Sequence, residues 1–236
     1  MDWNEFDAAL FDLDGVITPT AEVHMRAWQQ MFSEYFASKG LSEPYTENDY
    51  FTYLDGKPRY DGVGSMLEAR GITLPDGGPG DPATAETVCG LGNRKNEVFS
   101  QLLESEGVAP YPGSVKLVEW LEARGTRMAI VSSSANAADV LEAAGLGNDF
   151  ELIIGGKEAK AYGLKGKPAP DTFLYAADQL GVPKERAVVF EDALSGVAAG
   201  HAGNFGLVVG VDRGAGANEL TEAGADVVVS DLEELL

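Results

Sequence analysis

The stretch that decides the fold is residues 9–17, ALFDLDGVI. It is an apolar run that two carboxylates interrupt. Such a run predicts a buried β-strand, where unpaired charge is costly. Side chains two apart on a strand point the same way, so we expect Asp12 and Asp14 to face one pocket, with Gly15 letting the chain turn away. A divalent cation would compensate both charges, and Mg²⁺ prefers oxygen ligands. Taken alone, however, such a pair more often marks a strand end whose acids meet solvent or cap a helix.

Apolar runs rich in β-branched residues recur along the chain. They lie at 8–13, 127–132, 187–190, 207–211 and 226–229, and helical patterns alternate with them at 114–124, 136–145, 171–181, 194–202 and 216–223. Strand followed by helix, repeated in this way, predicts an α/β fold: a doubly wound parallel sheet with helices on both faces. Ligands of such sheets bind beyond the carboxyl ends of the strands, where Asp12 and Asp14 fall.

A helical insertion separates the first strand from the second. The spacing of apolar residues predicts helices from Pro19 to about residue 38 and at 48–54, 61–70 and 84–106, and the Gly- and Pro-rich stretch 74–83 predicts a loop. We therefore expect two domains: a sheet domain of residues 1–17 and 109–236, and a helical domain of residues 18–108 inserted into it.

The chain of 236 residues is strongly acidic, with 38 Asp and Glu against 17 Lys and Arg and a formal net charge of −21. This balance disfavours nucleic acid and anionic membranes as partners, and no apolar run is long enough to span a bilayer. The single cysteine, Cys89, fits a reducing compartment, and with two histidines a zinc site built on His and Cys is not expected. We expect a cytoplasmic, monomeric protein that acts on a small molecule.

Polar side chains also lie at the ends of the later strands. Ser132, Ser134 and Asn136 open the helix after the second strand, Lys167 precedes the helix at 171–181, and Glu191 and Asp192 follow the strand at 187–190. Taken singly, each group has a simpler explanation: the hydroxyls and the amide could form a helix N-cap, Lys167 could be a solvated surface charge, and the two acids could merely end a strand. Their common position at the carboxyl edge of one sheet makes coincidence a poor explanation.

Phosphoryl transfer would use all of these groups, because it needs a nucleophile, neutralisation of the phosphoryl oxygens and a proton donor for the leaving oxygen. Asp12 would attack phosphorus and become an aspartyl-phosphate. Asp14 would protonate the departing alcohol and later deprotonate water or a second hydroxyl. Mg²⁺, Ser132 and Lys167 would neutralise the phosphoryl oxygens. The acids available to the metal are Asp12, Asp14, Glu191 and Asp192.

These motifs resemble those of the haloacid-dehalogenase (HAD) superfamily of phosphotransferases. The stretches FDLDGVITPTAEVHMRAW, LDGKPR, GNRKN, YPG, VSSSAN and GKPAPD are together similar to its β-phosphoglucomutase-like branch, over essentially the whole chain. The resemblance implies a HAD-like, Rossmannoid core with an inserted α-helical cap. It also implies Mg²⁺ as cofactor and a sugar phosphate as substrate.

The resemblance further implies roles for single residues. Asp12 matches the nucleophile and Asp14 the general acid/base, and the metal would be held by Asp12, the main-chain carbonyl of Asp14 and Asp192. Ser132 and Lys167 would contact the transferring phosphoryl group. The other matches are substrate contacts: His24 near the nucleophile, Arg59 on the non-reacting phosphate, Lys95 lining the site, and Ser134 and Asn136 on the core side. Without the resemblance, His24 would be a helix-packing residue, and Arg59 and Lys95 would be surface charges.

The predicted function is that of a β-phosphoglucomutase, which converts β-glucose 1-phosphate to glucose 6-phosphate; the alternative is a HAD sugar-phosphate phosphatase. A mutase must keep its phosphoenzyme from water, so Arg59 and a closing cap matter more to it. A phosphorylated signalling receiver would have no use for the insertion, and a non-catalytic sugar-binding protein would be expected to have lost a motif. A nucleotide-cofactor enzyme is disfavoured, because neither G-x-G-x-x-G after the first strand nor G-x-x-x-x-G-K-[ST] occurs.

Overall fold

The computed structural model describes residues 2–236. The chain divides into two compact units. The first comprises Met1–Pro19 and Val108–Leu236, and the second is Thr20–Gly107. Within the described part of the chain, no helix combines the length and the apolar character needed to cross a bilayer.

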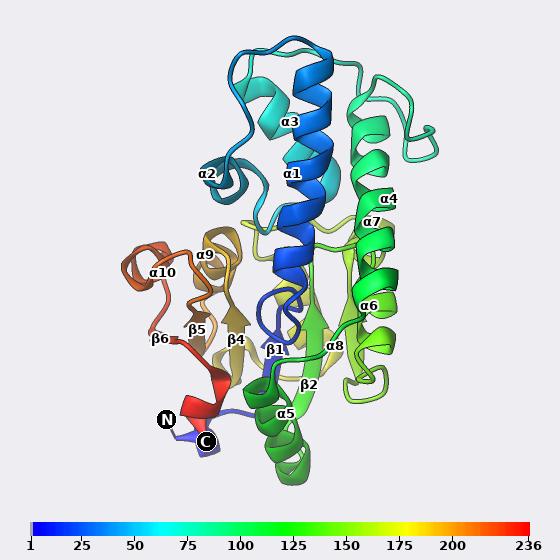
Figure 1. Cartoon of the computed structure of the whole chain (residues 1–236). Helices are drawn as coiled ribbons and strands as arrows, with labels where there is room; N and C mark the ends of the chain where they lie inside the picture. The colour runs from blue at the N-terminus through cyan, green and yellow to red at the C-terminus, as the bar shows by residue number, and fades with distance from the viewer. Residues whose placement is uncertain (1) are drawn as a thin grey trace. The chain divides into compact units, whose positions relative to one another are not determined.

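The first unit is built on a six-stranded parallel sheet (Figure 1). The strands are β1 (Ala8–Phe11), β2 (Arg127–Val131), β3 (Leu152–Ile154), β4 (Ala187–Glu191), β5 (Leu207–Val211) and β6 (Val227–Val229), in the spatial order β3-β2-β1-β4-β5-β6. β1 lies in the middle, with Leu10 opposite Ala129 of β2 on one side and Val189 of β4 on the other. The strand order therefore reverses at β1, which marks the carboxyl ends of β1, β2 and β4 as the binding crevice.

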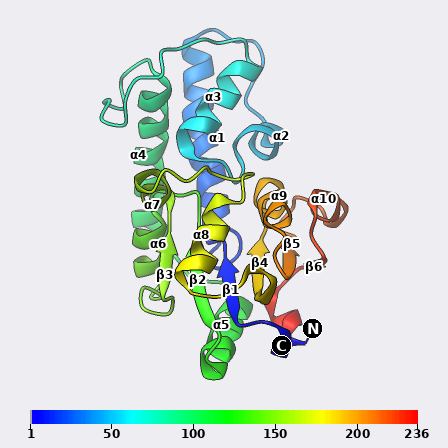
Figure 2. The same ribbon diagram turned by 180° about the vertical axis from the view of Figure 1, so that it is seen from behind.

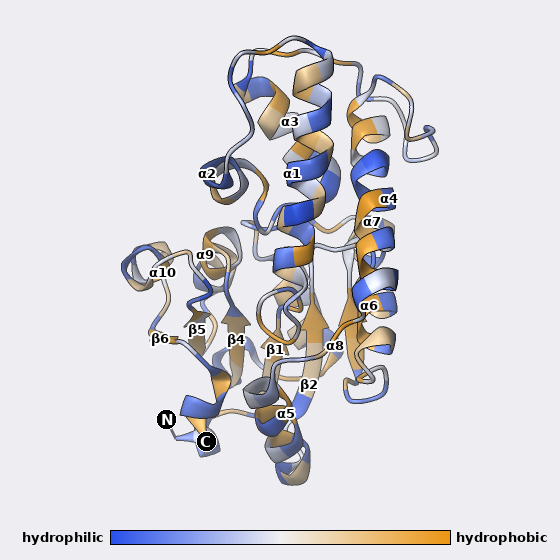
Figure 3. Cartoon of the chain, in the orientation of Figure 1, coloured by the Kyte–Doolittle hydropathy of each residue, from blue (hydrophilic) through white to orange (hydrophobic). Residues whose placement is uncertain are grey.

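Helices cover both faces of this sheet. They are α5 (Pro112–Arg124), α6 (Ala137–Ala143), α7 (Gly156–Ala161), α8 (Asp171–Gln179), α9 (Leu194–Gly203) and α10 (Ala217–Ala223), with short 3₁₀ turns η1 (Trp3–Glu5), η3 (Lys184–Arg186) and η4 (Leu232–Leu235). Leu10 packs in one core cluster with Phe173 of α8, which lies in front of the strands in Figure 2. On the other face Phe11 stacks on Phe190, with ring centroids 4.5 Å apart. Figure 3 shows the hydrophobic colouring of the strands that such burial requires. The predicted fold class is confirmed.

β1 ends earlier than the sequence predicts. The expected strand at 8–13 stops at Phe11, and Asp12 and Asp14 lie beyond it. A turn begins there, because the Leu13 carbonyl accepts hydrogen bonds from the main-chain N–H groups of Ile17 (2.9 Å) and Thr18 (3.0 Å). The strand therefore ends two residues earlier than predicted, and strand alternation alone does not orient the two acids. Asp12 and Asp14 still lie near each other, because the charge of Asp14 contributes to the raised pKa of Asp12.

One strand and one α-helix of the first unit are absent from the sequence prediction. β3 has three residues and α7 has six, and neither is long enough to show a clear apolar period. β3 forms the edge of the sheet beside β2. The sequence therefore predicts five of the six strands and misses β3, one of the two edge strands.

The second unit is helical. It contains α1 (Thr20–Ser38), α2 (Glu47–Asp49), a π-helical segment η2 (Tyr50–Leu54), α3 (Arg59–Ala69) and α4 (Val88–Glu106), and its core includes Met31, Phe32, Val63, Met66 and Leu91. The helix predicted at 84–106 begins later, because Thr87 caps it: the Thr87 hydroxyl accepts from the Gly90 N–H (2.9 Å) and donates to Asp81 of the preceding loop (2.6 Å). The helix predicted at 48–54 is divided between α2 and η2.

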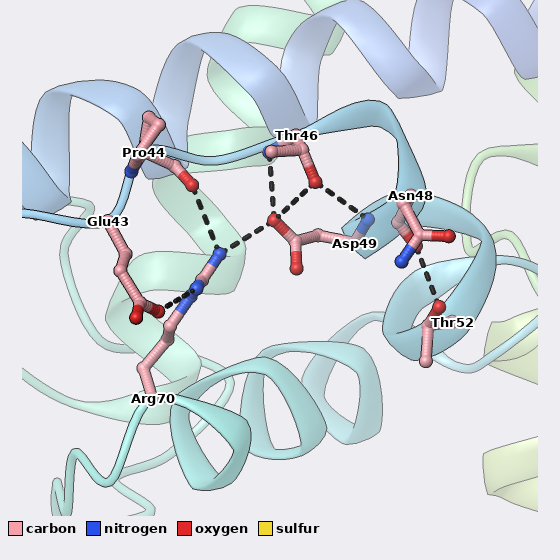
Figure 4. Close-up of polar contacts among 7 residues, drawn as sticks. All are labelled: Glu43, Pro44, Thr46, Asn48, Asp49, Thr52 and Arg70. Atoms are coloured by element: carbon pink, nitrogen blue, oxygen red, sulfur yellow. Dashed lines mark hydrogen bonds and ion pairs between the residues drawn. The ribbon is translucent and has the colours of Figure 1, made fainter.

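Arg70 links the end of α3 to the segment around α2 (Figure 4). Its guanidinium donates to the carboxylates of Asp49 (2.7 Å) and Glu43 (2.9 Å) and to the Pro44 carbonyl (3.2 Å). The Asp49 carboxylate also accepts from the N–H (2.8 Å) and the hydroxyl (2.9 Å) of Thr46, which completes a capping box at the start of α2. The side chains of Arg70 and Asp49 are only 14% and 10% exposed. Removing one partner would leave the other charge largely desolvated.

We expect Arg70→Ala to lower the free energy of unfolding of the helical unit by about 2–4 kcal/mol, because the Asp49 charge loses its partner. Arg26→Ala is the matched control. Arg26 also makes two bonds to one carboxylate, that of Glu106 (2.7 and 2.6 Å), but these side chains are 47% and 45% exposed, so its loss should stay below about 1 kcal/mol. Hydrogen exchange of the amides of α1 and α4 measures both effects. Equal losses would contradict the assignment of Arg70 as the stronger link.

Candidate active site

Polar side chains end three neighbouring strands at one edge of the sheet. Asp12 follows β1, Ser132 follows β2, and Glu191 ends β4 with Asp192 directly after it. Lys167 joins them from the loop between α7 and α8. The structure thus gathers at one place the core residues that the sequence analysis singles out from separate segments.

Lys167 is buried and binds two carboxylates. Its Nζ lies 2.5 Å from Oδ1 of Asp12 and 2.5 Å from Oε1 of Glu191, and it donates to the Val131 carbonyl at 2.9 Å. The ring of Phe173 lies 5.0 Å from the same nitrogen. The three protons of the ammonium therefore meet three oxygens. One belongs to Asp12, just after β1, one to Val131 of β2 and one to Glu191 of β4.

Burial affects the two ends of this ion pair differently. Burial alone would lower the pKa of Lys167, but the charges and hydrogen bonds of Asp12 and Glu191 outweigh it and raise that pKa above its ordinary value. Burial is also the largest effect on Asp12, and it raises the pKa of that carboxyl well above its usual range. Glu191 and Asp14 raise it further, against the attraction of Lys167. At Asp12, burial therefore outweighs the attraction of Lys167.

Three acids of the site could hold a cation. Asp12, Glu191 and Asp192 each offer a carboxylate oxygen, and these oxygens lie within 4.8 Å of one another. Hard oxygen donors with an excess of negative charge fit Mg²⁺. Gly15 makes room for the group: it has a φ of 88°, and a Cβ at this position would lie 1.8 Å from Oδ2 of Asp192.

A loop of hydroxyl groups follows β2. Oγ of Ser132 lies 3.5 Å from Oδ2 of Asp14 and accepts from the Ser134 N–H (3.0 Å), and Oγ of Ser134 accepts from the Asn136 N–H (3.2 Å). The Ser132 hydroxyl thus accepts a main-chain proton and donates its own proton to the Asp14 carboxylate, which links the two side chains. The segment after β3 supports this loop: Gly156 donates its N–H to the Ser134 carbonyl (2.9 Å), and a Cβ on Gly156 would lie 2.8 Å from a loop carbonyl oxygen.

In the second unit, His24 of α1 and Lys95 of α4 are in contact through Nδ1 and Nζ. Lys95 is only 2% exposed, and its Nζ lies 5.0 Å from the ring of Trp28 and 4.8 Å from that of Phe99. The His24 ring stacks on Phe99, with centroids 4.0 Å apart. Aromatic faces attract a desolvated ammonium, which helps to stabilise Lys95 in this position.

Arg59 begins α3 and lies against α4. Its Nη2 donates to Oδ1 of Asn96 (2.7 Å), and the neighbouring Tyr60 hydroxyl donates to Oδ1 of Asn93 (2.9 Å). The close approach requires Gly92, because a Cβ there would lie 2.7 Å from the Tyr60 ring. Burial lowers the pKa of Arg59, but a guanidinium stays charged in proteins. Among residues 2–236, no carboxylate forms an ion pair with Arg59, so its charge is not neutralised.

The sequence analysis misses some of these contacts. It assigns Glu191 to the metal site and does not predict its ion pair with Lys167. It also does not single out Asn96 or Phe99. Phe99 follows Lys95 by four residues, a spacing that puts both side chains on one helix face, so this signal could have found it. The partners of Glu191 and Asn96 lie far away in sequence, and no local pattern identifies them.

The family-model comparison identifies the class of protein. The sequence model of the haloacid dehalogenase-like hydrolases matches residues 6–204, which is most of the chain. The chain therefore belongs to this family, and it is an enzyme of the HAD superfamily. The family expected from the motifs is confirmed.

Within the family, the chain is similar to β-phosphoglucomutases. Proteins of that name from Mycobacterium bovis and Mycobacterium tuberculosis are 50% identical to it, over 97% of this chain and 91% of theirs. The crystal structure of a β-phosphoglucomutase from Clostridium difficile superposes with a TM-score of 0.79 at 25% identity, over 98% of this chain and 93% of that one. A protein from Thermotoga maritima named phosphorylated carbohydrates phosphatase is 28% identical, over 98% of this chain and 96% of its own length.

We expect Asp12→Asn to raise the thermal midpoint of unfolding by about 2–4 °C in a chelating buffer, because an amide replaces a buried carboxylate whose charge is under-compensated. Asp7→Asn is the control: Asp7 lies just before β1, is exposed and accepts a hydrogen bond from Arg186 (2.8 Å), so no rise is expected. Calorimetry of the two variants makes the comparison. If the midpoint of Asp12→Asn did not exceed that of Asp7→Asn, the charge at Asp12 would be adequately balanced by Lys167.

Proposed function

We propose that this enzyme is a β-phosphoglucomutase, which converts β-glucose 1-phosphate to glucose 6-phosphate through an aspartyl-phosphate. The observation that carries the proposal is the 50% identity to two mycobacterial proteins of that name over 97% of the chain. The core site supports it, since a buried carboxylate, a lysine, a hydroxyl loop and an acid cluster lie at one sheet edge.

Asp12 is the proposed nucleophile. Lys167 binds one oxygen of its carboxylate, and we assign the attack on phosphorus to the other oxygen. The new bond joins this oxygen to phosphorus while the bond from phosphorus to the leaving sugar oxygen breaks. Ser132 and Lys167 hold the phosphoryl oxygens, and Asp14 donates the proton that the leaving oxygen needs.

The second half of the reaction returns the phosphoryl group to the sugar. Asp14, now deprotonated, takes the proton of the 6-hydroxyl of β-glucose 1-phosphate while that oxygen attacks the aspartyl-phosphate. The product is glucose 1,6-bisphosphate. When this bisphosphate binds in the opposite orientation, its 1-phosphoryl group passes to Asp12 and glucose 6-phosphate leaves.

Mg²⁺ is the proposed cofactor. We assign it to Asp12, Asp192 and the main-chain carbonyl of Asp14, with Glu191 beside them. When bound, the ion supplies positive charge to the phosphoryl oxygens. The raised pKa of Asp12 and the spacing of the acid oxygens support this assignment.

The helical segment 18–108 is the proposed cap, and it would bind the end of the substrate that does not react. Arg59 presents a guanidinium that Asn96 orients, which suits a bidentate contact with the distal phosphate. We assign further substrate contacts to His24 and Lys95 in the cap, and to Ser134 and Asn136 in the core.

A sugar-phosphate phosphatase is the second candidate, and the similarity to the Thermotoga maritima phosphatase favours it. It would use the same first half-reaction, with water instead of a sugar hydroxyl as the acceptor. Product analysis separates the two. With β-glucose 1-phosphate, Mg²⁺ and a trace of glucose 1,6-bisphosphate, a mutase forms glucose 6-phosphate faster than inorganic phosphate. Inorganic phosphate alone, from several sugar phosphates, would reject the mutase.

We expect Asp12→Asn to abolish turnover of every substrate, and Arg59→Ala to slow isomerisation about 10- to 100-fold while hydrolysis of an aryl phosphate changes much less, because only the sugar bisphosphate has a distal phosphate. Arg26→Ala, which removes an exposed arginine of the same unit, should leave both rates unchanged. Steady-state rates on the two substrates provide the measurement. An equal loss on both in Arg59→Ala would remove the reason for assigning Arg59 to the distal phosphate.

We expect Mg²⁺ to stabilise the protein by about 2.7 kcal/mol at roughly 100 times its dissociation constant, because it binds the folded acid cluster. Asp192→Asn should remove most of this gain, whereas Asp178→Asn, on the exposed face of α8, should keep it. Thermal midpoints with and without Mg²⁺ give the result. A gain of the same size in Asp192→Asn would place the ion elsewhere.

A further inference from the structure

The turn that follows Asp14 is held at successive main-chain carbonyls. The Thr18 carbonyl accepts from the Gly15 N–H at 2.7 Å, and the Val16 carbonyl accepts from the Ser114 hydroxyl at 2.6 Å. The Ile17 carbonyl accepts from the N–H of Tyr111 at 2.9 Å. The turn therefore does not rest on β1 alone; the start of α5 and the segment before it also determine its conformation.

Arg213 supplies the bond to the remaining carbonyl of this series. Its Nε donates to the Gly15 carbonyl at 3.0 Å, and its Nη1 donates to the Ser230 carbonyl at 2.9 Å. The guanidinium carbon lies 3.9 Å from the centroid of the Tyr111 ring. One planar group thus joins three segments: the turn after Asp14, the chain that returns to the sheet unit at Tyr111, and the end of β6.

The loop that carries Arg213 is itself fixed. It follows β5, and Oδ1 of Asp212 accepts from the N–H groups of Gly214 (3.0 Å) and Gly216 (3.1 Å). The N–H of Asp212 donates to the Val229 carbonyl at 2.8 Å. Arg213 therefore projects from a loop anchored to β6, which gives its guanidinium a defined position relative to the sheet.

We propose that Arg213 is a positioning residue, which holds the Asp14–Gly15 segment in the orientation that general acid/base catalysis by Asp14 requires. This inference rests on the proposed role of Asp14. The Gly15 carbonyl belongs to the peptide between Gly15 and Val16, and the Gly15 N–H, which belongs to the peptide after Asp14, donates to the Thr18 carbonyl. The two bonds fix the planes on both sides of the Gly15 Cα and so limit rotation of the backbone next to Asp14.

Lysine cannot replace Arg213 in this arrangement. A guanidinium presents donors in a fixed plane and stacks on an aromatic face, so it meets two carbonyls and the Tyr111 ring at once. An ammonium on a flexible stem keeps the charge but not this geometry. Arg213→Lys is therefore the informative substitution, because it separates positioning from charge.

The test uses two phosphate esters that differ in their need for an acid. Departure of 4-nitrophenol from its phosphate needs little protonation, whereas departure of a sugar alcohol needs the Asp14 proton. The parameter is kcat/KM, which covers the steps up to departure of the leaving group. We expect Arg213→Lys to lower kcat/KM for glucose 1,6-bisphosphate at least about tenfold, and that for 4-nitrophenyl phosphate less than about threefold.

Arg124→Lys is the matched control. Arg124 also stacks on an aromatic ring, with its guanidinium carbon 4.7 Å from the Trp120 centroid, and donates to Asn4 (3.3 Å), but it lies at the end of α5 and touches neither the turn nor β6. It should change neither value of kcat/KM. If Arg213→Lys folds poorly, Arg213→Gln, with the same expected selectivity, replaces it.

Asp14→Asn separates failure of this inference from failure of the proposed function. Asp14→Asn should show the same selective loss in larger measure, and Arg213→Lys added to it should cause little further loss. If Asp14→Asn is not selective, the proposed role of Asp14 is wrong and the inference fails with it. If Asp14→Asn is selective but Arg213→Lys lowers both substrates equally, or neither, then Arg213 serves only the fold and the inference alone is overturned.

Discussion

The core site depends on the hydrogen bonds and ion pairs of one buried group, the ammonium of Lys167. It bonds to Asp12, Glu191 and the Val131 carbonyl, and so joins the carboxyl ends of three adjacent strands. Burying these charges would be unfavourable without such mutual compensation. Burial, aided by Glu191 and Asp14, nevertheless keeps the pKa of Asp12 raised against the attraction of Lys167. The oxygens of Asp12, Glu191 and Asp192 lie within 4.8 Å of one another beside this single ammonium, so the acids of the site could hold a cation.

The turn after β1 places the second acid. β1 stops at Phe11, and the chain then turns through Gly15, whose missing side chain admits the Asp192 carboxylate. Hydrogen bonds from outside the turn support its carbonyls, among them those of Ser114 and Arg213. The orientation of Asp14 is thus a property of several segments, although the residue itself belongs to a short contiguous motif.

Helix α4 organises the basic groups of the second unit. Gly92 allows α3 to approach, and Lys95 and Asn96, one after the other, meet His24 of α1 and Arg59 of α3. Successive residues on a helix point about 100° apart, so one turn of α4 contacts two neighbouring helices. The unit therefore holds a guanidinium and an ammonium whose positions are both fixed by packing and hydrogen bonds.

The alternation of five strands with helices, the helical segment after β1, and the acids and hydroxyls at the strand ends all follow from the sequence, because hydrophobic period and residue type are local properties. The sequence predicts neither the end of β1 at Phe11 nor the edge strand β3, since hydrogen bonds to the turn decide the first and β3 is too short to show a period. Tertiary structure alone decided that Lys167 meets Glu191 and that Arg213, 198 residues away, reaches Gly15. Those contacts depend on which distant segments the packed sheet brings within hydrogen-bond distance, and no local pattern records that distance.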